Sequence, residues 1–372
     1  MLDSITTRAA VLHHSGGTLT LENLTLSSLR DDEVLVKLVA TGICHTDASF
    51  MQRPFLVDRP MVLGHEGAGY VEAIGAAVTS VAVGDPVVLS FDSCGHCETC
   101  NDDHPAYCHD FVAHNFVGQR ADGSTAWQGP TGPVRHAFFG QSSFATRSVC
   151  RQRNVIKLDT DADLALMGPL GCGLQTGAGA VLNVLNPQPH QTLAVFGVGS
   201  VGLAAIMAAK ARGLTCIVAV DVMPSRLEKA QALGASHVIN AKTSANVVAE
   251  VRAACPPGMH FALDTTANMA VLRQATECLR HRGVCGFVGG ATAEAEICVN
   301  SRDMMIHGKT LKGIIEGDAD PHRFIPQLIG LYRQGLFPMD QLASFYPLEA
   351  IHQAMEDAES GAAIKAILTM PA

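Results

Sequence analysis

The chain has 372 residues, of which 48% are hydrophobic and 16% charged, and its formal net charge is −9. A chain of this length usually divides into two domains. Its acidic balance, without a cluster of Lys and Arg, argues against a nucleic-acid partner. The start of the chain lacks a secretory signal, and the apolar run 193–211 is interrupted by glycines, which favours a strand, a turn and a helix over a membrane span. We therefore expect a cytoplasmic protein that binds neither nucleic acid nor membrane.

Residues up to about 175 contain short Val-rich strands separated by glycine turns, for example 33–40, 69–73 and 86–89. This pattern predicts a mostly antiparallel β domain. Residues 118–136 are rich in Gly, Pro and polar side chains, which predicts a surface loop. The tail after 320 has a helical pattern and a final strand, and we expect it to return to the first domain.

Between 190 and 317, short apolar strands alternate with segments of helical length, which predicts a parallel, doubly wound sheet of six strands and an α/β fold overall. The expected strands are 192–196, 217–220, 237–239, 261–264, 284–288 and 310–315, and the expected helices are 201–212, 225–233, 244–254 and 269–281. The predicted domains are 1–177 with 320–372, and 178–319.

Twelve cysteines in a chain without a secretory signal favour thiols and metal ligands over a disulfide framework. Six of them are scattered through the sequence, several in apolar strand-like runs. We interpret these six as small buried hydrophobic residues; they are Cys150, Cys216, Cys255, Cys278, Cys285 and Cys298.

Four cysteines lie close together in a lobe at 91–110, where Cys94, Cys97, Cys100 and Cys108 form C-x2-C-x2-C-x7-C. Four thiolates within fifteen residues match a structural zinc site. The alternative is an iron–sulfur cluster, because C-x2-C-x2-C also opens bacterial ferredoxin motifs. Those motifs continue C-x3-C-Pro, whereas the last gap here is seven residues and His109 follows, so the spacing favours zinc.

A glycine-rich turn between an expected strand and helix predicts a dinucleotide site. Gly197, Gly199 and Gly202 form G-x-G-x-x-G, and a pyrophosphate would lie over Ser200 and Val201 at the start of the helix. Asp221 follows at the end of the next strand, where a carboxylate binds ribose hydroxyls and favours NAD over NADP. Arg226 is close enough in sequence to contact the same ribose. The alternative is a structural glycine turn followed by a capping Asp.

A second group of metal-ligand types is dispersed: Cys44, His65 in Gly64-His65-Glu66-Gly67, and Cys172 between two glycines. Together they would give a zinc site of two cysteines and one histidine with an open fourth position, which is the arrangement of catalytic sites. For a lone histidine the alternative is a core residue, but a position between glycines and beside an acid is unusual for a core.

These motifs, in this order, resemble the zinc-dependent medium-chain alcohol dehydrogenases over essentially the whole chain. The resemblance implies a GroES-like catalytic domain and a Rossmann domain. Within the family the chain is most similar to bacterial aryl (benzyl) alcohol and geraniol dehydrogenases. The segments that carry the closer likeness are 138–144, 168–173 and 316–321.

The resemblance implies two zinc ions per chain, a catalytic one and a structural one, and reversible oxidation of a primary aromatic or allylic alcohol to the aldehyde with hydride transfer to NAD. It implies that Thr46 binds the reacting oxygen, that Asp47 orients His65, and that Glu66 approaches the zinc transiently. It also places His45 and Thr176 at the cofactor. A homo-oligomer, either a dimer or a tetramer, is expected.

Two positions depart from the family pattern. Ser49 stands where many relatives have the histidine that ends the proton path, so we expect protons to leave through water or another group. His45 stands where an arginine often holds the pyrophosphate, so we expect NADH to be held less firmly. The residues leave two other functions open. One is a glutathione-dependent formaldehyde dehydrogenase, which shares both zinc sites. The other is a non-catalytic nucleotide-binding or structural relative, but such proteins have lost zinc ligands, and Cys44, His65 and Cys172 are intact here.

Overall fold

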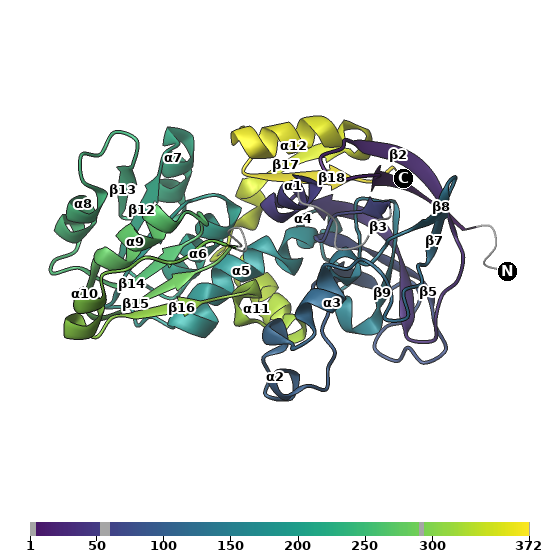
Figure 1. The fold of residues 1–372 in the computed structure, drawn as a ribbon, viewed down its shortest axis with the longest axis horizontal. Helices are drawn as coiled ribbons and strands as arrows, with labels where there is room; N and C mark the ends of the chain where they lie inside the picture. Colours follow the sequence, from purple (N-terminus) through teal and green to yellow (C-terminus); the bar gives the residue numbers. More distant parts are fainter. Residues whose placement is uncertain (1–4, 53–59, 290–293, 372) are drawn as a thin grey trace. The chain divides into compact units, whose positions relative to one another are not determined.

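The computed structural model describes residues 5–52, 60–289 and 294–371 (Figure 1). The chain divides into two compact units. The first comprises Met1–Cys172, Asp320–Pro326 and Asp340–Ala372, and the second comprises Gly173–Ala319 and Gln327–Met339. The sequence pattern predicted a boundary after residue 177 and the whole of 320–372 in the first domain, whereas residues 173–177 and 327–339 group with the second unit.

The first unit is built on two sheets, as the Val-rich strands predicted. One sheet has the order β4-β1-β2-β7-β8, with β1 (Thr6–Leu12), β2 (Leu19–Leu26), β4 (Met61–Val62), β7 (Trp127–Gly129) and β8 (Gly132–Val134). The other has the order β10-β6-β5-β3-β18-β17, and β9 also pairs with β3. Its strands are β3 (Glu33–Gly42), β5 (Gly67–Ile74), β6 (Pro86–Leu89), β9 (Arg147–Arg151), β10 (Val155–Lys157), β17 (Ala343–Pro347) and β18 (Lys365–Thr369).

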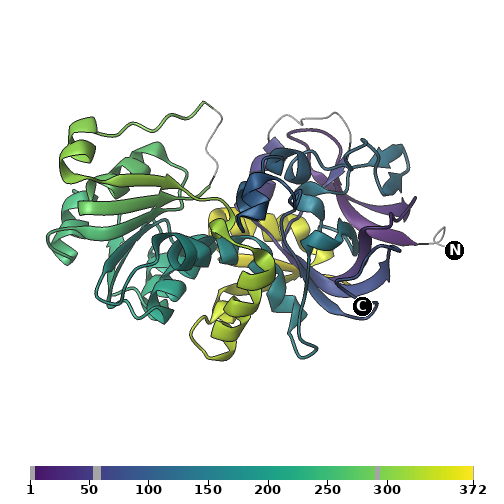
Figure 2. The same ribbon diagram turned by 90° about the horizontal axis from the view of Figure 1, so that it is seen from below.

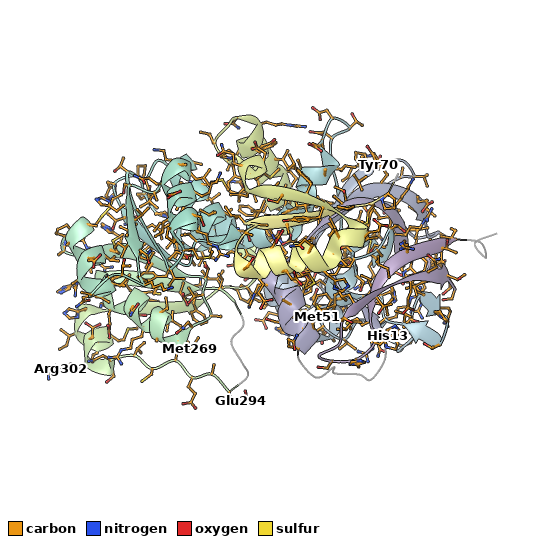
Figure 3. All side chains as sticks on the ribbon, turned by 90° about the horizontal axis from the view of Figure 1, so that it is seen from above. His13, Met51, Tyr70, Met269, Glu294 and Arg302 are labelled. Atoms are coloured by element: carbon orange, nitrogen blue, oxygen red, sulfur yellow. A yellow bond between two sulfur atoms is a disulfide. The ribbon has the colours of Figure 1, made fainter. Side chains whose placement is uncertain are left out.

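The pairs in these two sheets are antiparallel except for β17 with β18. Alternate residues of β3, namely Val34, Val36 and Leu38, are buried against Val71 and Val87, as the two-residue period of a strand requires. The C-terminal strand β18 lies beside β3, so the end of the chain completes the sheet that the N-terminal segment begins (Figure 1). Tyr70 of β5, 46% exposed, lies at the surface of this unit (Figure 3).

The prediction of a surface loop at 118–136 was wrong in part. Strands β7 and β8 form a hairpin there and extend the first sheet through β2. Trp127 and Val134 face each other in the hairpin, and they are 3% and 2% exposed. The Gly and Pro content marks the turn, and burial of these two side chains makes the flanking residues into strands.

The first unit also contains helices, and α1 among them carries predicted site residues. The helices are α1 (His45–Gln52), α2 (Glu98–Asn101), α3 (Phe111–Asn115), α4 (Leu164–Met167) and α12 (Ile351–Ser360), while α11 (Pro321–Arg333) begins in the first unit and ends in the second. Two 3₁₀ turns, Phe138–Gly140 and Gly168–Gly171, stand beside the sites described below.

The second unit holds the predicted sheet of six parallel strands, with helices on both faces (Figure 2). The order is β13-β12-β11-β14-β15-β16, which is the dinucleotide-binding order, with its crevice at the carboxyl ends of β11 and β14. The strands are β11 (Thr192–Phe196), β12 (Cys216–Asp221), β13 (His237–Asn240), β14 (Met259–Asp264), β15 (Leu279–Phe287) and β16 (Thr310–Gly313).

The helices of the second unit follow the predicted alternation, with α10 as an addition that the sequence analysis missed. They are α5 (Gly173–Gly179), α6 (Ser200–Ala211), α7 (Pro224–Leu233), α8 (Val247–Ala254), α9 (Met269–Glu277) and α10 (Ser301–His307). The apolar run 193–211 forms β11, the glycine turn and α6. Within the described part of the chain, no helix has the length and apolar character needed to cross a membrane.

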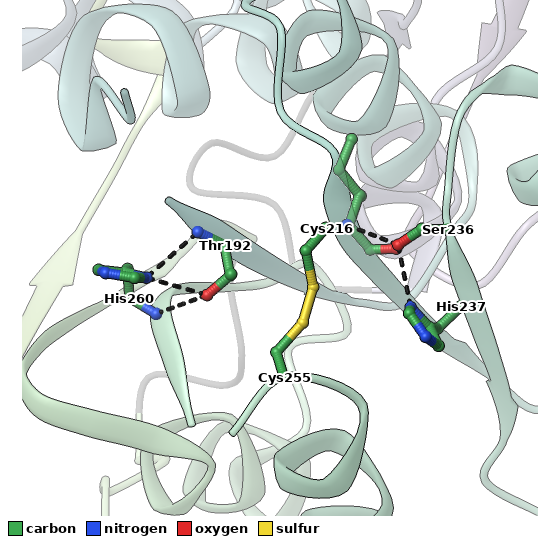
Figure 4. The surroundings of a disulfide bond; sticks show 7 residues. Thr192, Cys216, Ser236, His237, Cys255 and His260 are labelled. Carbon is green, nitrogen blue, oxygen red and sulfur yellow. Dashed lines mark hydrogen bonds between the residues drawn. A yellow bond between two sulfur atoms is a disulfide. The ribbon is translucent and has the colours of Figure 1, made fainter. Parts of the chain in front are cut away.

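One interpretation of the scattered cysteines was wrong. Cys216 and Cys255 are joined in a disulfide, while the other ten cysteines form none (Figure 4). Cys216 is the first residue of β12 and Cys255 follows the last turn of α8. Thirty-nine residues separate the two in sequence, so only the packing of α8 against the sheet brings them together.

Helices α5 and α6 approach each other so closely that their backbones touch. A Cβ on Gly177 would lie 1.9 Å from the carbonyl oxygen of Val201 and 3.0 Å from the Cβ of Ala204. This contact requires glycine, and it fixes the position of the first turn of α6, where the glycine-rich motif ends.

We expect Gly177→Ala to lower the free energy of unfolding by about 2 kcal/mol, because the added methyl group overlaps backbone atoms that cannot move away cheaply. The control is Gly330→Ala in α11, where an added Cβ meets no heavy atom within 4 Å. That control should raise the free energy of unfolding by up to about 1 kcal/mol, because alanine is the better helix former. Urea unfolding of both variants checks this, and equal midpoints would contradict the proposed backbone contact.

Asp264 ends β14 at the carboxyl edge of the same sheet and is 1% exposed. Its Oδ1 accepts hydrogen bonds from the Thr266 amide and hydroxyl, at 3.1 and 2.7 Å. Burial raises the pKa of this carboxyl from 3.8 to about 6, and the bonds from Thr266 oppose the change. Because the folded pKa is the higher one, the carboxyl favours folding below pH 3.8, and this contribution is lost as the pH rises through about 6.

We therefore expect the stability of the wild type, relative to Asp264→Asn, to fall by about 2.4 kcal/mol between pH 3.8 and pH 6.5, since the asparagine carries no charge. Calorimetric melting of both proteins from pH 3.5 to pH 7 measures the difference. Parallel stability curves across this interval would show that the carboxyl titrates normally in the folded protein.

Candidate active site

The first unit brings together three side chains that lie far apart in sequence. The Sγ atoms of Cys44 and Cys172 and a ring nitrogen of His65 all lie within 4.8 Å of one another. Cys44 directly precedes α1, His65 follows β4, and Cys172 follows the 3₁₀ turn Gly168–Gly171. These are the three residues that the sequence analysis grouped as an open metal site.

The ring of His65 is fully buried and fixed on one side only. Its Nδ1 lies 3.0 Å from Oδ1 of Asp47, and both side chains are 0% exposed. Its Nε2 is buried and has no hydrogen-bond partner. With Nδ1 donating to the carboxylate, Nε2 carries a free lone pair, and a buried lone pair without a partner is costly unless a metal takes it.

The thiol of Cys44 has the electrostatic setting of a thiolate. Its pKa is held well below the usual range, first by the hydrogen bond with Cys172, with the charge of Lys365 adding to this against the opposing effect of burial. A thiolate, a second cysteine and a free imidazole nitrogen form a donor set that fits zinc. The residues present therefore fit the metal that the sequence predicted.

The carboxylate of Asp47 holds the segments that carry two of these three side chains. Its Oδ2 accepts a hydrogen bond from the amide of Cys44 at 3.0 Å. Its Oδ1 accepts from the amide of Gly64 at 3.0 Å, in addition to the contact with His65. One buried carboxylate thereby fixes both loops and the direction of the imidazole.

Glu66 is engaged by a lysine that the sequence analysis did not identify. Lys365 of β18 donates from Nζ to both carboxylate oxygens, at 3.0 and 2.9 Å, and to the carbonyl of Ile43 at 3.0 Å. Glu66 is 0% exposed and Lys365 is 3% exposed. Burial raises the pKa of Glu66 to about 7, against the charge of Lys365. The only signal in the sequence was a charged residue at the start of an apolar strand.

Three further predicted residues lie on α1. The hydroxyl of Thr46 is 3.7 Å from Sγ of Cys44. His45, the first residue of the helix, is exposed, and Ser49 is half-buried one turn further on. Their roles in substrate and cofactor binding stay predictions.

Four phenylalanines and His65 contact one another through their rings, and we call this group the aromatic cluster. Its phenylalanines are Phe50, Phe116, Phe138 and Phe139. Phe139 stacks on His65 with centroids 4.5 Å apart, and Phe138 meets the same ring edge-on at 5.5 Å. Phe50 and Phe116 contact these two rings and each other. The ring centroids are 4.8 Å apart for Phe50 and Phe138, 5.3 Å for Phe116 and Phe139, and 5.1 Å for Phe50 and Phe116. Phe138 and Phe139 are buried, whereas Phe50 and Phe116 are half-buried. The half-buried rings are the ones that can meet a ligand.

The four-cysteine lobe also forms a compact donor set. The Sγ atoms of Cys94, Cys97, Cys100 and Cys108 lie within 4.8 Å of one another. Backbone amides point at the sulfurs: that of Cys94 donates to Cys108 at 3.2 Å, and that of Cys97 donates to Cys94 at 3.3 Å. Hydrogen bonds led by that from Thr99 lower the pKa of Cys97 to about 5. Four sulfurs gathered on one point fit a closed metal site.

The second unit places the glycine-rich turn at the carboxyl end of β11. Gly197 has φ +80°, and a Cβ there would lie 2.7 Å from Oγ1 of Thr265. A Cβ on Gly202 would lie 2.0 Å from the carbonyl oxygen of Gly197, so this glycine permits the close turn. A Cβ on Gly199 would meet no heavy atom within 4 Å, and α6 begins at the next residue, Ser200. The open side at Gly199 leaves the helix N-terminus free for an anion.

Asp221 is fixed at the end of β12 by three backbone amides. Oδ2 accepts from Val198 at 2.7 Å, and Oδ1 accepts from Val222 and Met223 at 2.7 and 2.9 Å. The carboxylate is thus tied directly to the glycine-rich turn. The remaining predicted residues of this site are Val201 on α6, Thr176 on α5, and Arg226 on α7, whose Nε is buried without a hydrogen-bond partner.

Comparison with known proteins agrees with both units. The model of the alcohol dehydrogenase GroES-like domain matches residues 30–160, and that of the zinc-binding dehydrogenases matches residues 200–332. Geraniol dehydrogenase of Castellaniella defragrans is 43% identical over 98% of each chain, and a probable alcohol dehydrogenase of a Pseudomonas species is 40% identical over 74% of this chain and 88% of its own.

Two solved structures cover 99% of this chain and all of their own. The alcohol dehydrogenase zinc-binding domain protein of Burkholderia ambifaria is 46% identical with a TM-score of 0.96. Benzyl alcohol dehydrogenase of Acinetobacter calcoaceticus is 42% identical with a TM-score of 0.95. The resemblance seen in the sequence is confirmed, and the chain belongs to the zinc-dependent alcohol dehydrogenases, a family of oxidoreductases.

Proposed function

We propose that the chain catalyses the reversible, NAD-dependent oxidation of a primary aromatic or allylic alcohol to the aldehyde. The observation that carries this proposal is the group of Cys44, His65 and Cys172. The His65 ring, whose buried Nε2 has no hydrogen-bond partner, also belongs to the aromatic cluster. Support also comes from the relatives, two of which are named for geraniol and benzyl alcohol.

Cys44, His65 and Cys172 would hold the catalytic zinc. When bound, zinc supplies a Lewis acid that makes the substrate hydroxyl more acidic. Asp47 keeps the imidazole in the tautomer and direction that binding requires. Lys365 compensates the charge of Glu66 beside the site, so the predicted transient approach of Glu66 to the metal requires release of this ion pair.

Thr46 would begin proton export, since its hydroxyl lies 3.7 Å from Sγ of Cys44. Its Oγ1 would accept the hydroxyl proton of the alcohol and pass its own proton to water. NAD, when bound, would supply the acceptor for the hydride that leaves the alcohol carbon. The alcohol thereby loses one proton and one hydride and leaves as the aldehyde. Ser49 offers no imidazole at the expected end of the path, so water or another group would carry the proton onward.

The dinucleotide would lie over the start of α6, where the amides of Ser200 and Val201 face the pyrophosphate. Asp221 already accepts three amide hydrogen bonds, and a carboxylate has about four acceptor sites, so it retains room for a ribose hydroxyl. Its charge would repel a 2′-phosphate, which favours NAD. His45 would contact the pyrophosphate less firmly than an arginine, and Thr176 and Arg226 would complete the site.

The four-cysteine lobe would hold a second, structural zinc, because four sulfurs leave no open position for substrate. We also expect a cytoplasmic homo-oligomer, a dimer or a tetramer, that acts on a small-molecule alcohol or aldehyde.

The proposed function is tested by comparing kcat/KM with NAD for benzyl alcohol, geraniol, cinnamyl alcohol, ethanol and S-(hydroxymethyl)glutathione. We expect the aromatic and allylic alcohols to exceed ethanol by about 100-fold, since burying a ring or an isoprenoid chain adds about 3 kcal/mol of binding. A preference for S-(hydroxymethyl)glutathione would instead support the formaldehyde dehydrogenase alternative. A zinc-loaded protein that oxidises none of these would support the non-catalytic alternative.

We predict that Phe116→Leu selectively impairs aromatic substrates. Leucine keeps the site apolar but removes ring contacts of about 0.5–1.5 kcal/mol each, so kcat/KM for benzyl alcohol should fall about 3- to 10-fold. The value for 1-hexanol should change less than about 2-fold, because an alkyl chain makes no ring contact. Phe345→Leu, at a ring 51% exposed on β17, is the matched control. Equal losses for both alcohols would argue against a substrate contact by Phe116.

We expect Asp47→Asn to weaken zinc binding at the open site by about 10- to 100-fold, because the imidazole loses its charged partner. Dialysis against a chelator followed by elemental analysis should leave one zinc per chain, held by the four-cysteine lobe. The wild type and the exposed-site control Asp340→Asn should keep two under the same conditions. Retention of both ions by Asp47→Asn would show that Asp47 does not support the metal.

A further inference from the structure

The Cys216–Cys255 disulfide closes one half of the second unit. The bond joins the first residue of β12 to the residue that follows α8 (Figure 4). Cys255 is 8% exposed, and Cys216 is partly buried against the same hydrophobic core. Between the two lie the rest of β12, helix α7, strand β13 and helix α8.

The outer elements of the enclosed segment, β13 and α8, bury few side chains, among them Ile239, Val247 and Val251. Strand β13 is at the edge of the sheet and pairs with β12 on one side only. His237 and Val238 of β13 are exposed, and α8 buries only Val247 and Val251 among its eight residues. A short amphipathic helix and a single-sided strand open at low free energy cost, so a covalent tie between β12 and α8 has a large effect on them.

The same segment carries the carboxylate assigned to the adenosine ribose. Asp221 is the last residue of β12, at the other end of the strand that Cys216 begins. The amide of Ala241, just after β13, donates to the carbonyl oxygen of Asp221 at 2.8 Å. Asn240 pairs with Asp221 in the sheet register. Opening of β13 therefore removes the support on one side of Asp221.

The other thiols of this core are poor competitors for exchange. Cys278 and Cys285 belong to the same hydrophobic cluster and are 0% exposed. Burial raises the pKa of Cys285 to about 12 and that of Cys278 further above its usual range. Thiols that stay protonated and inaccessible do not attack a disulfide, so Cys216 and Cys255 form an exclusive pair.

We propose that Cys216 and Cys255 form a reversible thiol–disulfide pair that stabilises the β12–α8 half of the second unit and thereby tightens binding of the dinucleotide. The part of this proposal that concerns the dinucleotide rests on the proposed function. Oxidation removes two protons and two electrons from the two thiols and forms the S–S bond. A small disulfide such as oxidised glutathione accepts them and is cleaved to two thiols.

The test equilibrates the zinc-loaded protein in buffers of reduced and oxidised glutathione and then alkylates the free thiols for peptide mass spectrometry. The melting temperature, hydrogen exchange over residues 237–254 and the Kd for NADH are measured on the same samples. We expect the oxidised protein to melt about 5 °C higher. Its exchange in 237–254 should be at least about 10-fold slower, and its Kd for NADH about 3- to 10-fold lower.

Two variants separate this pair from the zinc thiolates. The double variant Cys216→Ser/Cys255→Ser should show none of these responses and should match the reduced wild type. Cys298→Ser, which removes a single exposed thiol, should respond as the wild type does. Elemental analysis of each sample establishes that zinc is retained, so that a response cannot come from the metal sites.

The proposal is overturned if Cys216 and Cys255 are free thiols in every buffer. It is also overturned if the melting temperature and the hydrogen exchange over residues 237–254 do not change with the redox state. A stability response with an unchanged Kd would overturn its link to the dinucleotide. Failure of every form to bind NADH would refute the proposed function alone, because melting and hydrogen exchange test the disulfide without any cofactor.

Discussion

The candidate active site depends on one buried carboxylate. Asp47 accepts hydrogen bonds from the amides of Cys44 and Gly64 and from the ring of His65, and its side chain is 0% exposed. A buried charge is tolerated only where such partners surround it. Because its partners lie on two different loops, the requirement to satisfy Asp47 also fixes the distance between the first cysteine and the histidine. The hydrogen bonds of Asp47 thus set the positions of two of the three proposed zinc ligands.

The second unit depends on a different constraint, namely close approach of backbones. Gly177 lets α5 touch α6, and Gly202 lets α6 touch the turn at Gly197. These contacts leave no room for side chains, and they set the helix N-terminus at the carboxyl edge of the sheet. Asp221 then ties the turn to β12 through the amide of Val198. The order of the parallel strands and the position of the glycines together create the dinucleotide site.

Much of the fold and of the candidate sites could be predicted from the sequence, because these features depend on local patterns. The alternation of apolar strands with helical segments predicted six parallel strands, and all six are found. The spacing of Cys94, Cys97, Cys100 and Cys108 predicted a compact donor set. The hairpin at β7 and β8 was missed, because its turn residues resemble a loop and only the burial of Trp127 and Val134 makes the flanks into strands.

The sequence by itself determined the kinds of residue that carry the chemistry, since glycine spacing, cysteine spacing and strand periodicity are properties of neighbouring residues. The tertiary structure alone decided which distant residues meet. Lys365 lies 299 positions from Glu66 in sequence and Cys255 lies 39 from Cys216. The aromatic cluster brings together α1, the residue after α3, the turn at Phe138 and His65. Contacts of this kind arise from packing over long chain separations, which leaves no local pattern from which to predict them.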